Sequence, residues 1–215
     1  MASSSRSGLQ SPLHTFRGGL MNKSDRQIMD CVIDGQVELF EELVRRHRAS
    51  MLRAAESKLR NRSQAEDAVQ DCFLSAFARR RTFNPEFSFR GWLWTILLNV
   101  CRTQFRREAR HASQLSLSGA VLVANEPSTP ETGLSELLRA ERSEILADLL
   151  DQIPELEADA LRLRFFGELQ FDEIAQAMNC SLNGARTRVR RGLERLAELA
   201  RRGSLCAYDG DDHEL

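Results

Sequence analysis

Residues 112–135 divide the sequence into two parts. They read ASQLSLSGAVLVANEPSTPETGLS, are dominated by Ser, Thr, Pro and Gly, and show no helical period. On both sides apolar residues recur every three to four positions, and the alternating pattern of strands is nearly absent. We therefore predict an all-α protein in which two small helical domains, residues 25–111 and 136–202, are joined by a flexible linker over 112–135.

The first predicted domain contains three patterned helices. The first helix follows a cap at Asp34–Gly35, and Ser63–Glu66 has the form of a capping box that opens the second. Asn84–Pro85 cannot continue a helix, so Thr82–Ser88 should be a loop before a third helix over Phe89–Glu108. The residues expected to be buried are Val37, Phe40, Leu43, His47 and Met51, then Ala65, Val69, Cys72, Phe73, Ala76 and Phe77, then Trp92, Leu93, Ile96, Leu97 and Val100.

The second predicted domain ends in two helices separated by a polar turn. An approach helix over Leu156–Phe166 begins with Pro154 in its first turn and ends at Gly167. FDEIAQAMNCSLNGARTRVRRGLERL, residues 171–196, then gives a helix, a turn and a second helix that Ser181 can cap. The side chains expected to face the core are Phe171, Ile174, Ala175, Met178, Leu182, Ala185, Val189, Leu193 and Leu196. This order predicts a helix-turn-helix unit.

Charges are segregated along the chain, although its formal net charge is −1. Residues 45–111 carry an excess of nine positive charges, residues 112–160 an excess of eight negative charges, residues 181–202 an excess of five positive charges, and the tail 203–215 an excess of four negative charges. Nucleic acid responds to the local field within one Debye length, roughly 8–10 Å, and not to the sum. The two basic segments are therefore candidate DNA-binding surfaces.

Several functional classes do not fit the sequence. The longest apolar run, Trp92–Leu98, is too short to cross a bilayer, and residues 1–24 lack the apolar core of a secretory signal. We therefore expect a cytoplasmic protein with a flexible N-terminal arm and no membrane insertion. The five cysteines and four histidines have neither metal-site nor disulfide-framework spacing. Because no phosphate-binding loop or nucleophile–base arrangement is present either, we predict no catalytic activity and no metal or other cofactor.

Two clusters of side chains favour DNA as the partner. Arginine and threonine occupy the faces of the last predicted helix away from its apolar stripe, where guanidinium groups can contact guanine edges and phosphates. A solvated arginine-rich face is the alternative. In the first domain Phe83, Phe87, Phe89, Trp92 and Trp94 lie near arginine clusters, as in proteins that hold unstacked bases. A small helical domain also needs aromatic residues in its core, so both interpretations stay open for each ring.

Two longer motifs connect these features. AEDAVQDCFLSAFARRRTF is followed by FSFRGWLWTILLNVCRTQFRRE, and the helix-turn-helix unit comes after the linker. In this order, over residues 36–110 and 138–200, the sequence resembles the extracytoplasmic-function (ECF, group IV) sigma factors of bacterial RNA polymerase, which belong to the sigma-70 family. The resemblance implies a sigma region 2 domain and a helix-turn-helix sigma region 4 domain. It also implies a factor that binds core polymerase, recognises the −35 and −10 promoter elements and helps to melt DNA.

The resemblance assigns roles to individual positions. The surface that docks on the clamp helices of the largest polymerase subunit would be Asp67, Val69, Asp71, Phe73, Leu74, Phe77 and Arg80. The residues that hold and melt the −10 element would be Phe83, Phe87, Phe89, Trp92, Asn99, Arg102, Arg106 and Arg107. The residues at the −35 element would be Ser181, Arg186, Thr187, Arg188, Arg190, Arg191 and Arg195. The implied partners are core polymerase, including its flap, promoter DNA and an anti-sigma factor.

Departures from the family pattern lie mainly in the second domain. Gln170 stands where a capping Ser is usual, and Gly184 and Gly192 lie inside the predicted recognition helix, where each glycine costs roughly 0.5–1 kcal/mol relative to alanine. We therefore expect a marginally stable second domain. The main alternative is a stand-alone LuxR-like helix-turn-helix transcriptional regulator, which would leave Glu66–Arg110 without a role. A helical adaptor that binds only protein would leave the two basic segments unexplained.

Overall fold

The computed structural model describes residues 23–118 and 144–208, and every regular element within these ranges is helical. In chain order they are α2 (Asp25–Ile33), the 3-10 turn η1 (Val37–Leu39), α3 (Phe40–Leu59), α4 (Arg62–Ala78), the 3-10 turn η2 (Arg80–Thr82), α5 (Phe89–Ser118), a helical segment over 144–151, α7 (Glu155–Phe165), α8 (Phe171–Ala177) and α9 (Leu182–Tyr208). None of these helices is long and apolar enough to cross a membrane. The predicted fold class is confirmed.

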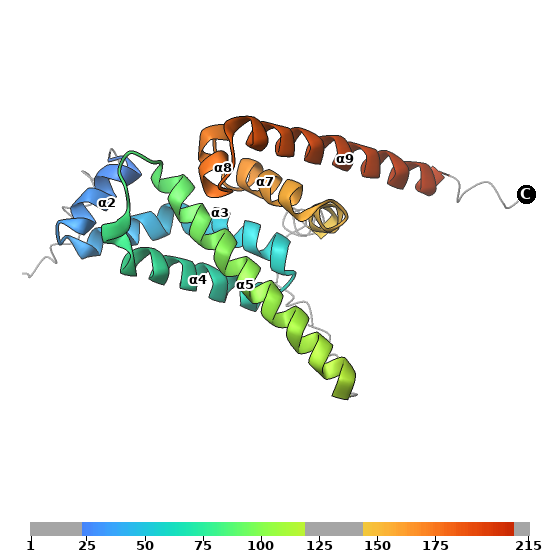
Figure 1. Ribbon diagram of the computed structural model, residues 1–215, viewed down its shortest axis with the longest axis horizontal. Coiled ribbons are helices and arrows are strands. Elements are labelled where there is room, and N and C mark those ends of the chain that lie inside the picture. The colour runs from blue at the N-terminus through green and yellow to red at the C-terminus, as the bar shows by residue number, and fades with distance from the viewer. Residues whose placement is uncertain (1–22, 119–143, 209–215) are drawn as a thin grey trace, which may run out of the picture.

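Helices α2 to α5 form one bundle, and α7 to α9 form a second one beside it (Figure 1). The expected faces of α3, α4 and α5 supply most of the first core, with Phe77, Trp92 and Val100 only partly buried and Val37 exposed. Trp94 is also buried, at 1% exposure, so of its two open interpretations, core packing and base binding, the structure supports core packing.

Two predicted helix starts in the first domain are wrong. Asp34–Gly35 ends α2 and does not cap α3: Asp34 is the C-cap residue, and Gly35 follows with φ of +112°. Helix α4 begins after Asn61, whose Oδ1 accepts a hydrogen bond from the backbone N–H of Gln64 at 3.0 Å, so Ser63 lies inside the helix. Helix α3 follows η1 without a side-chain cap, whereas Asn61 has the extended backbone conformation that an N-cap residue requires.

Two helices continue past their predicted ends. Helix α5 runs to Ser118 and not to Glu108, so the predicted linker boundary at residue 112 lies inside it, and α9 runs to Tyr208, past the predicted tail boundary at 203. Extending an existing helix costs far less than nucleating a new one, so Ser-rich residues continue α5 that would not begin a helix. The remaining linker residues 119–143, the tail residues 209–215 and the arm residues 1–22 lie outside the described residues.

Helix α9 is continuous through both of its predicted weak points. A Cβ atom at Gly192 would lie 2.8 Å from Leu161 Cδ1 and 3.4 Å from the backbone oxygen of Glu157. Gly192 therefore permits the close approach of α9 to α7. Two residues of α9 that were predicted to be internal, Leu182 and Leu193, are 42% and 43% exposed.

Gly192→Ala should destabilise the protein, although alanine is the better helix former. The added methyl group overpacks the α7–α9 contact, at a typical cost of about 1–3 kcal/mol, whereas helix propensity returns at most about 1 kcal/mol. Urea unfolding followed by circular dichroism measures the difference. Leu193→Ala, at the exposed neighbouring position, is the matched control and should change the unfolding free energy little. If Gly192→Ala were as stable as the wild type, the close approach would not be required.

The two bundles are joined by direct contacts as well as by the chain. Helix α8 packs against the N-terminal half of α5 (Figure 1). At this junction Ser88 donates a hydrogen bond to the Glu173 carboxylate, and the Arg90 guanidinium donates to the backbone oxygen of Gly167. A Cβ atom at Gly167 would lie 3.0 Å from Cε2 of Trp94. Packing therefore requires glycine at position 167.

Candidate protein and nucleic-acid interfaces

The residues predicted to dock on polymerase lie along α4 and the turn after it. Leu74 is 60% exposed, and Asp67 and Asp71 are exposed on the same helix. A groove of about 520 Å³ lies beside them, with apolar residues of α3 and α4, including Phe40 and Phe77, in its lining. An exposed leucine on the same helix as two exposed carboxylates, next to an apolar groove, suits a protein partner with apolar and basic side chains.

Other members of this predicted set are structural. Val69 and Phe73 are buried in the core, and Phe73 packs edge to face on Phe40 at 6.3 Å between ring centroids. The Arg80 guanidinium lies 4.3 Å from the centroid of the Phe77 ring and donates a hydrogen bond to the Phe77 backbone oxygen at 2.9 Å. These residues therefore support the α4 surface from within, whereas the side chains of Leu74 and the two aspartates are exposed on it.

Most of the aromatic residues predicted to hold bases are internal. Phe83 and Phe89 are 5% and 3% exposed and pack edge to face at 5.8 Å, and the half-buried Trp92 ring lies 5.4 Å and 5.9 Å from them. Phe87 differs: it is 55% exposed, in the loop where Asn84 accepts a hydrogen bond from its backbone N–H at 3.1 Å. Of the predicted phenylalanines, Phe87 is the one that can reach a base in this conformation.

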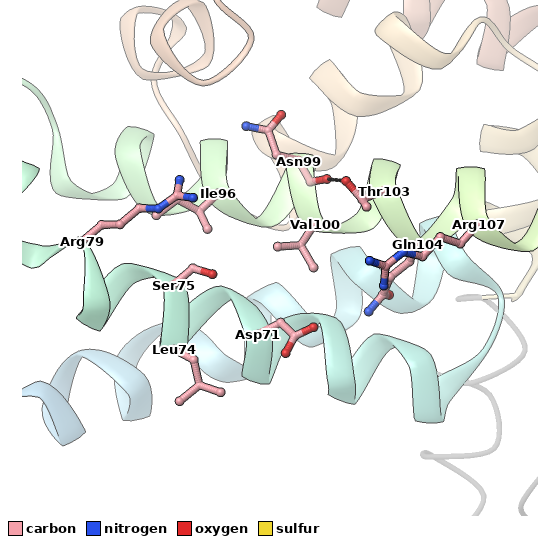
Figure 2. Close-up of a pocket in the computed structure, with 10 residues that line it drawn as sticks. All are labelled: Asp71, Leu74, Ser75, Arg79, Ile96, Asn99, Val100, Thr103, Gln104 and Arg107. Carbon is pink, nitrogen blue, oxygen red and sulfur yellow. Dashed lines mark hydrogen bonds between the residues drawn. The ribbon is translucent and has the colours of Figure 1, made fainter.

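Asn99 is exposed on α5 and lines a cavity of about 340 Å³ between α4 and α5. Figure 2 shows this cavity, to which α4 contributes Asp71 and Leu74, its C-cap residue Arg79 also contributes, and α5 contributes Ile96, Asn99 and Arg107. An amide and two guanidinium groups beside apolar walls can bind a base edge and the adjacent phosphate. Because Asp71 and Leu74 belong to the predicted polymerase-docking set, the two surfaces share an edge.

The three arginines predicted on α5 have different environments. Arg106 and Arg107 are exposed. Arg102 Nη2 donates a hydrogen bond to Asp159 Oδ2 at 3.0 Å, and its Nε lies 3.9 Å from Glu155 Oε1. Arg102 therefore contacts the second domain and is not available to DNA in this conformation.

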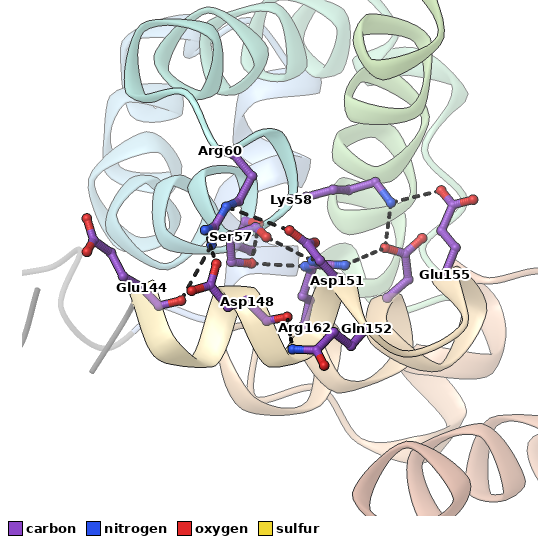
Figure 3. A network of polar contacts seen from close by, with 11 residues as sticks. Ser57, Lys58, Arg60, Glu144, Asp148, Asp151, Gln152, Glu155 and Arg162 are labelled. Carbon is purple, nitrogen blue, oxygen red and sulfur yellow. Dashed lines mark hydrogen bonds and ion pairs between the residues drawn. The ribbon is translucent and has the colours of Figure 1, made fainter. Parts of the chain in front are cut away.

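A buried charge cluster joins the two domains. We define the Asp159 cluster as Ser57, Lys58, Arg102, Glu155, Asp159 and Arg162. Figure 3 labels Ser57, Lys58, Glu155 and Arg162 of this cluster. The Asp159 side chain is fully buried, and its Oδ1 lies 2.8 Å from Lys58 Nζ and 3.4 Å from Arg162 Nη1. Three cations, on α3, α5 and α7, therefore share one internal carboxylate.

The remaining polar groups of the Asp159 cluster are also paired. Arg162 donates hydrogen bonds to the hydroxyl and the backbone oxygen of Ser57 at 2.9 Å and 2.8 Å. Burial lowers the pKa of Arg162, and the hydrogen bond from Lys58 lowers the pKa of Glu155. No sequence pattern predicts this cluster, because its partners on different domains are 57 to 105 residues apart and each charge alone resembles a surface residue.

The predicted −35 set lies in the N-terminal part of α9 and at its cap. Ser181 Oγ accepts a hydrogen bond from the backbone N–H of Gly184 at 3.0 Å, which confirms the predicted cap. Thr187 and Arg188 are half-buried, whereas the exposed arginines are Arg186, Arg190, Arg191 and Arg195. Arg195 forms an ion pair with Glu157 of α7 at 3.1 Å and therefore also connects two helices of the domain.

Helix α8, which precedes this turn, has its own capping contact. Glu173 Oε2 accepts a hydrogen bond from the Gln170 backbone N–H at 2.8 Å, which is the half of a capping box that the side chain at the third helical position supplies. At the start of α8, the Phe171 ring centroid lies 5.1 Å from the Arg164 guanidinium of α7 and 5.8 Å from the Arg186 guanidinium of α9. Phe171 therefore contacts both neighbouring helices of the domain.

Comparison with known proteins identifies both domains. The family model "Sigma-70 region 2" matches residues 43–111, and "Sigma-70, region 4" matches residues 143–196. RNA polymerase sigma factor CarQ of Myxococcus xanthus is 30% identical over 77% of this chain and 91% of its own length. RNA polymerase sigma-H factor of Pseudomonas aeruginosa is 25% identical over 81% of this chain and 93% of its own.

Two solved structures have the same fold. CnrH, in complex with the cytosolic domain of CnrY, aligns with a TM-score of 0.62 and 23% identity over 83% of this chain and 97% of its own. The sigma factor RpoE, in complex with the anti-sigma factor NepR from Bartonella quintana, aligns with a TM-score of 0.60 and 22% identity over 75% of this chain and 96% of its own.

Proposed function

We propose, since this chain belongs to the sigma-70 family as an ECF RNA polymerase sigma factor, that it binds core RNA polymerase, recognises −35 and −10 promoter elements and helps to melt DNA. The observation that carries the proposal is the succession of both sigma regions in one chain, at residues 43–111 and 143–196. The LuxR-like alternative is not favoured, because it gives no role to the domain that matches region 2.

The surfaces of the described residues support separate roles in binding polymerase, the −10 element and the −35 element. The α4 surface around Leu74 would dock on the polymerase clamp, and Phe87 with the cavity at Asn99 would hold the −10 element. The exposed arginines of α9 would enter the major groove at the −35 element. Residues 25–111 would thus act as region 2 and residues 136–202 as region 4, with the helical extension of α5 leading into the linker.

An anti-sigma factor is the further partner that we propose. The RpoE structure holds one, and CnrH is held by the cytosolic domain of CnrY. This chain has the fold of both proteins over most of its length.

Run-off transcription tests the proposal directly. Core polymerase is incubated with a library of promoter fragments, with and without this protein, and the transcripts are sequenced. We expect new start sites that share −35 and −10 sequences and that require the protein. If the protein neither co-purifies with core polymerase nor directs any start, the assignment is wrong.

Arg190→Ala should reduce recognition of one −35 base. The side chain is exposed on the N-terminal half of α9 and pairs only locally, with Glu194 at 2.8 Å. Loss of a base contact of this kind costs about 1–3 kcal/mol at the contacted position. Binding of the holoenzyme to a set of −35 variants measures the effect. Arg201→Ala, at an exposed position further along α9, should weaken all variants equally or not at all; the same pattern for Arg190→Ala would contradict the role.

A further inference from the structure

The second domain covers the N-terminal half of α5, the helix that follows the proposed −10 loop. Helix α8 packs on it, and the Ser88–Glu173 hydrogen bond lies at the junction. A Cβ atom at Gly91 would lie 2.8 Å from Gln176 Oε1 and 3.3 Å from the Glu173 backbone oxygen. DNA cannot occupy this part of α5 while α8 is in place.

The Asp159 cluster holds the same two domains together about three turns further along α5, at Arg102. It engages Arg102, a residue of the proposed −10 surface, through the hydrogen bond to Asp159. Ion clusters of this kind are strong while every partner is present, but their net contribution is small because burying charge costs solvation energy. The closed arrangement is therefore specific in geometry. It can be released when water solvates the three cations or when a polyanion pairs with them.

The α4 surface is unaffected by this closure. Leu74 and the carboxylates of Asp67 and Asp71 remain exposed while α7 and α8 cover α5. The closed chain can therefore present its docking surface for polymerase and withhold part of its DNA surface at the same time.

We propose that the Asp159 cluster is an intramolecular latch. It keeps the free protein in a closed state that docks on core polymerase but binds promoter DNA poorly, and the domains separate before Arg102 and the start of α5 contact the −10 element. This inference rests on the proposed function. The latch requires no other protein to impose the closed state. Separation of the domains is then a step that follows docking on core polymerase.

The latch is tested by opening it from two sides. Asp159→Asn removes the charge that the three cations share, and Gln176→Trp enlarges the α8 side chain that lies against Gly91. Asp172→Asn, the same change at an exposed position of α8, is the matched control. Circular dichroism confirms the helical content of each full-length variant, and if Asp159→Asn does not fold, Gln176→Trp decides the result.

Two measurements are made on the free proteins. Small-angle X-ray scattering gives the radius of gyration, and fluorescence anisotropy gives the affinity for a promoter fragment from the run-off assay. For the open variants we expect a larger radius and about tenfold or more tighter binding to DNA, since the closed state reduces affinity by the fraction of competent molecules. Wild type and Asp172→Asn should be compact and bind weakly.

The outcomes separate the latch from the proposed function. If wild type directs transcription but the open variants match it in both radius and DNA affinity, the latch is refuted and the sigma-factor function stands. If wild type directs no transcription with core polymerase, the function fails, and the scattering data still decide by themselves whether the Asp159 cluster holds the domains together.

Discussion

Leu74→Glu should abolish transcription by the reconstituted holoenzyme and leave the protein folded. Leu74 is the most exposed large apolar residue of α4, and it follows the exposed Asp67 and Asp71 on that helix, beside the apolar groove. Replacing it removes an apolar anchor and adds a third negative charge where the partner surface must be apolar and basic. Central interface residues of this kind typically contribute about 2–4 kcal/mol, so the affinity for core polymerase should fall by about 30- to 1000-fold.

The effect of Leu74→Glu on stability should be small. The position is exposed, and glutamate is nearly as good a helix former as leucine, so the unfolding free energy should change by no more than about 0.5 kcal/mol. Titration of labelled protein with core polymerase measures the affinity. Ile145→Glu makes the same kind of change at another exposed apolar residue, in the second domain. If the control loses affinity and Leu74→Glu does not, the docking surface lies elsewhere.

Helical periodicity predicted the fold class and most of the core because burial of a helix face depends on local spacing. The same reasoning missed α2, although the signal was present. Ser24 and Gln27 form a capping box in front of Ile28, Met29 and Val32, all of which are fully buried. A helix of this length contains one apolar stripe of three residues, and a polar N-terminal context hides so short a pattern.

The candidate sites were harder to predict than the helices because they depend on tertiary contacts. The glycine at position 192 appeared as a weakness of one helix, and only the packing of α9 on α7 shows that a larger residue does not fit there. Arg102 appeared as one of several DNA-binding arginines, and its partner Asp159 is separated from it by 57 residues. No local pattern relates such residues.

The burial of each aromatic residue of the first domain also depends on tertiary contacts, and this difference in burial predicts a large difference in stability between two variants. Phe89→Ala should destabilise the protein by about 3–5 kcal/mol, because the ring is buried and packs against Phe83, Trp92 and His47. Phe87→Ala should cost far less, since that ring is mostly solvated. Urea unfolding of the two variants makes the comparison. Equal losses of stability would show that Phe87 also belongs to the core.

In the folded protein, Phe87→Ala should impair open-complex formation more than Phe89→Ala, the reverse of the order expected for stability. Stacking of a base on an aromatic ring contributes about 1–3 kcal/mol, so Phe87→Ala should reduce open-complex formation by about 5- to 150-fold, measured as permanganate reactivity of the −10 thymines. This defect should persist at low temperature, because it concerns a contact and not folding. Phe89→Ala should also lose activity when warm but recover it on cooling, as the folded fraction returns. Recovery of Phe87→Ala on cooling would show that its defect is one of folding and would contradict the base contact at Phe87. A persistent defect in a fully folded Phe89→Ala protein would assign the base contact to the buried ring and would require the first domain to rearrange when the DNA opens.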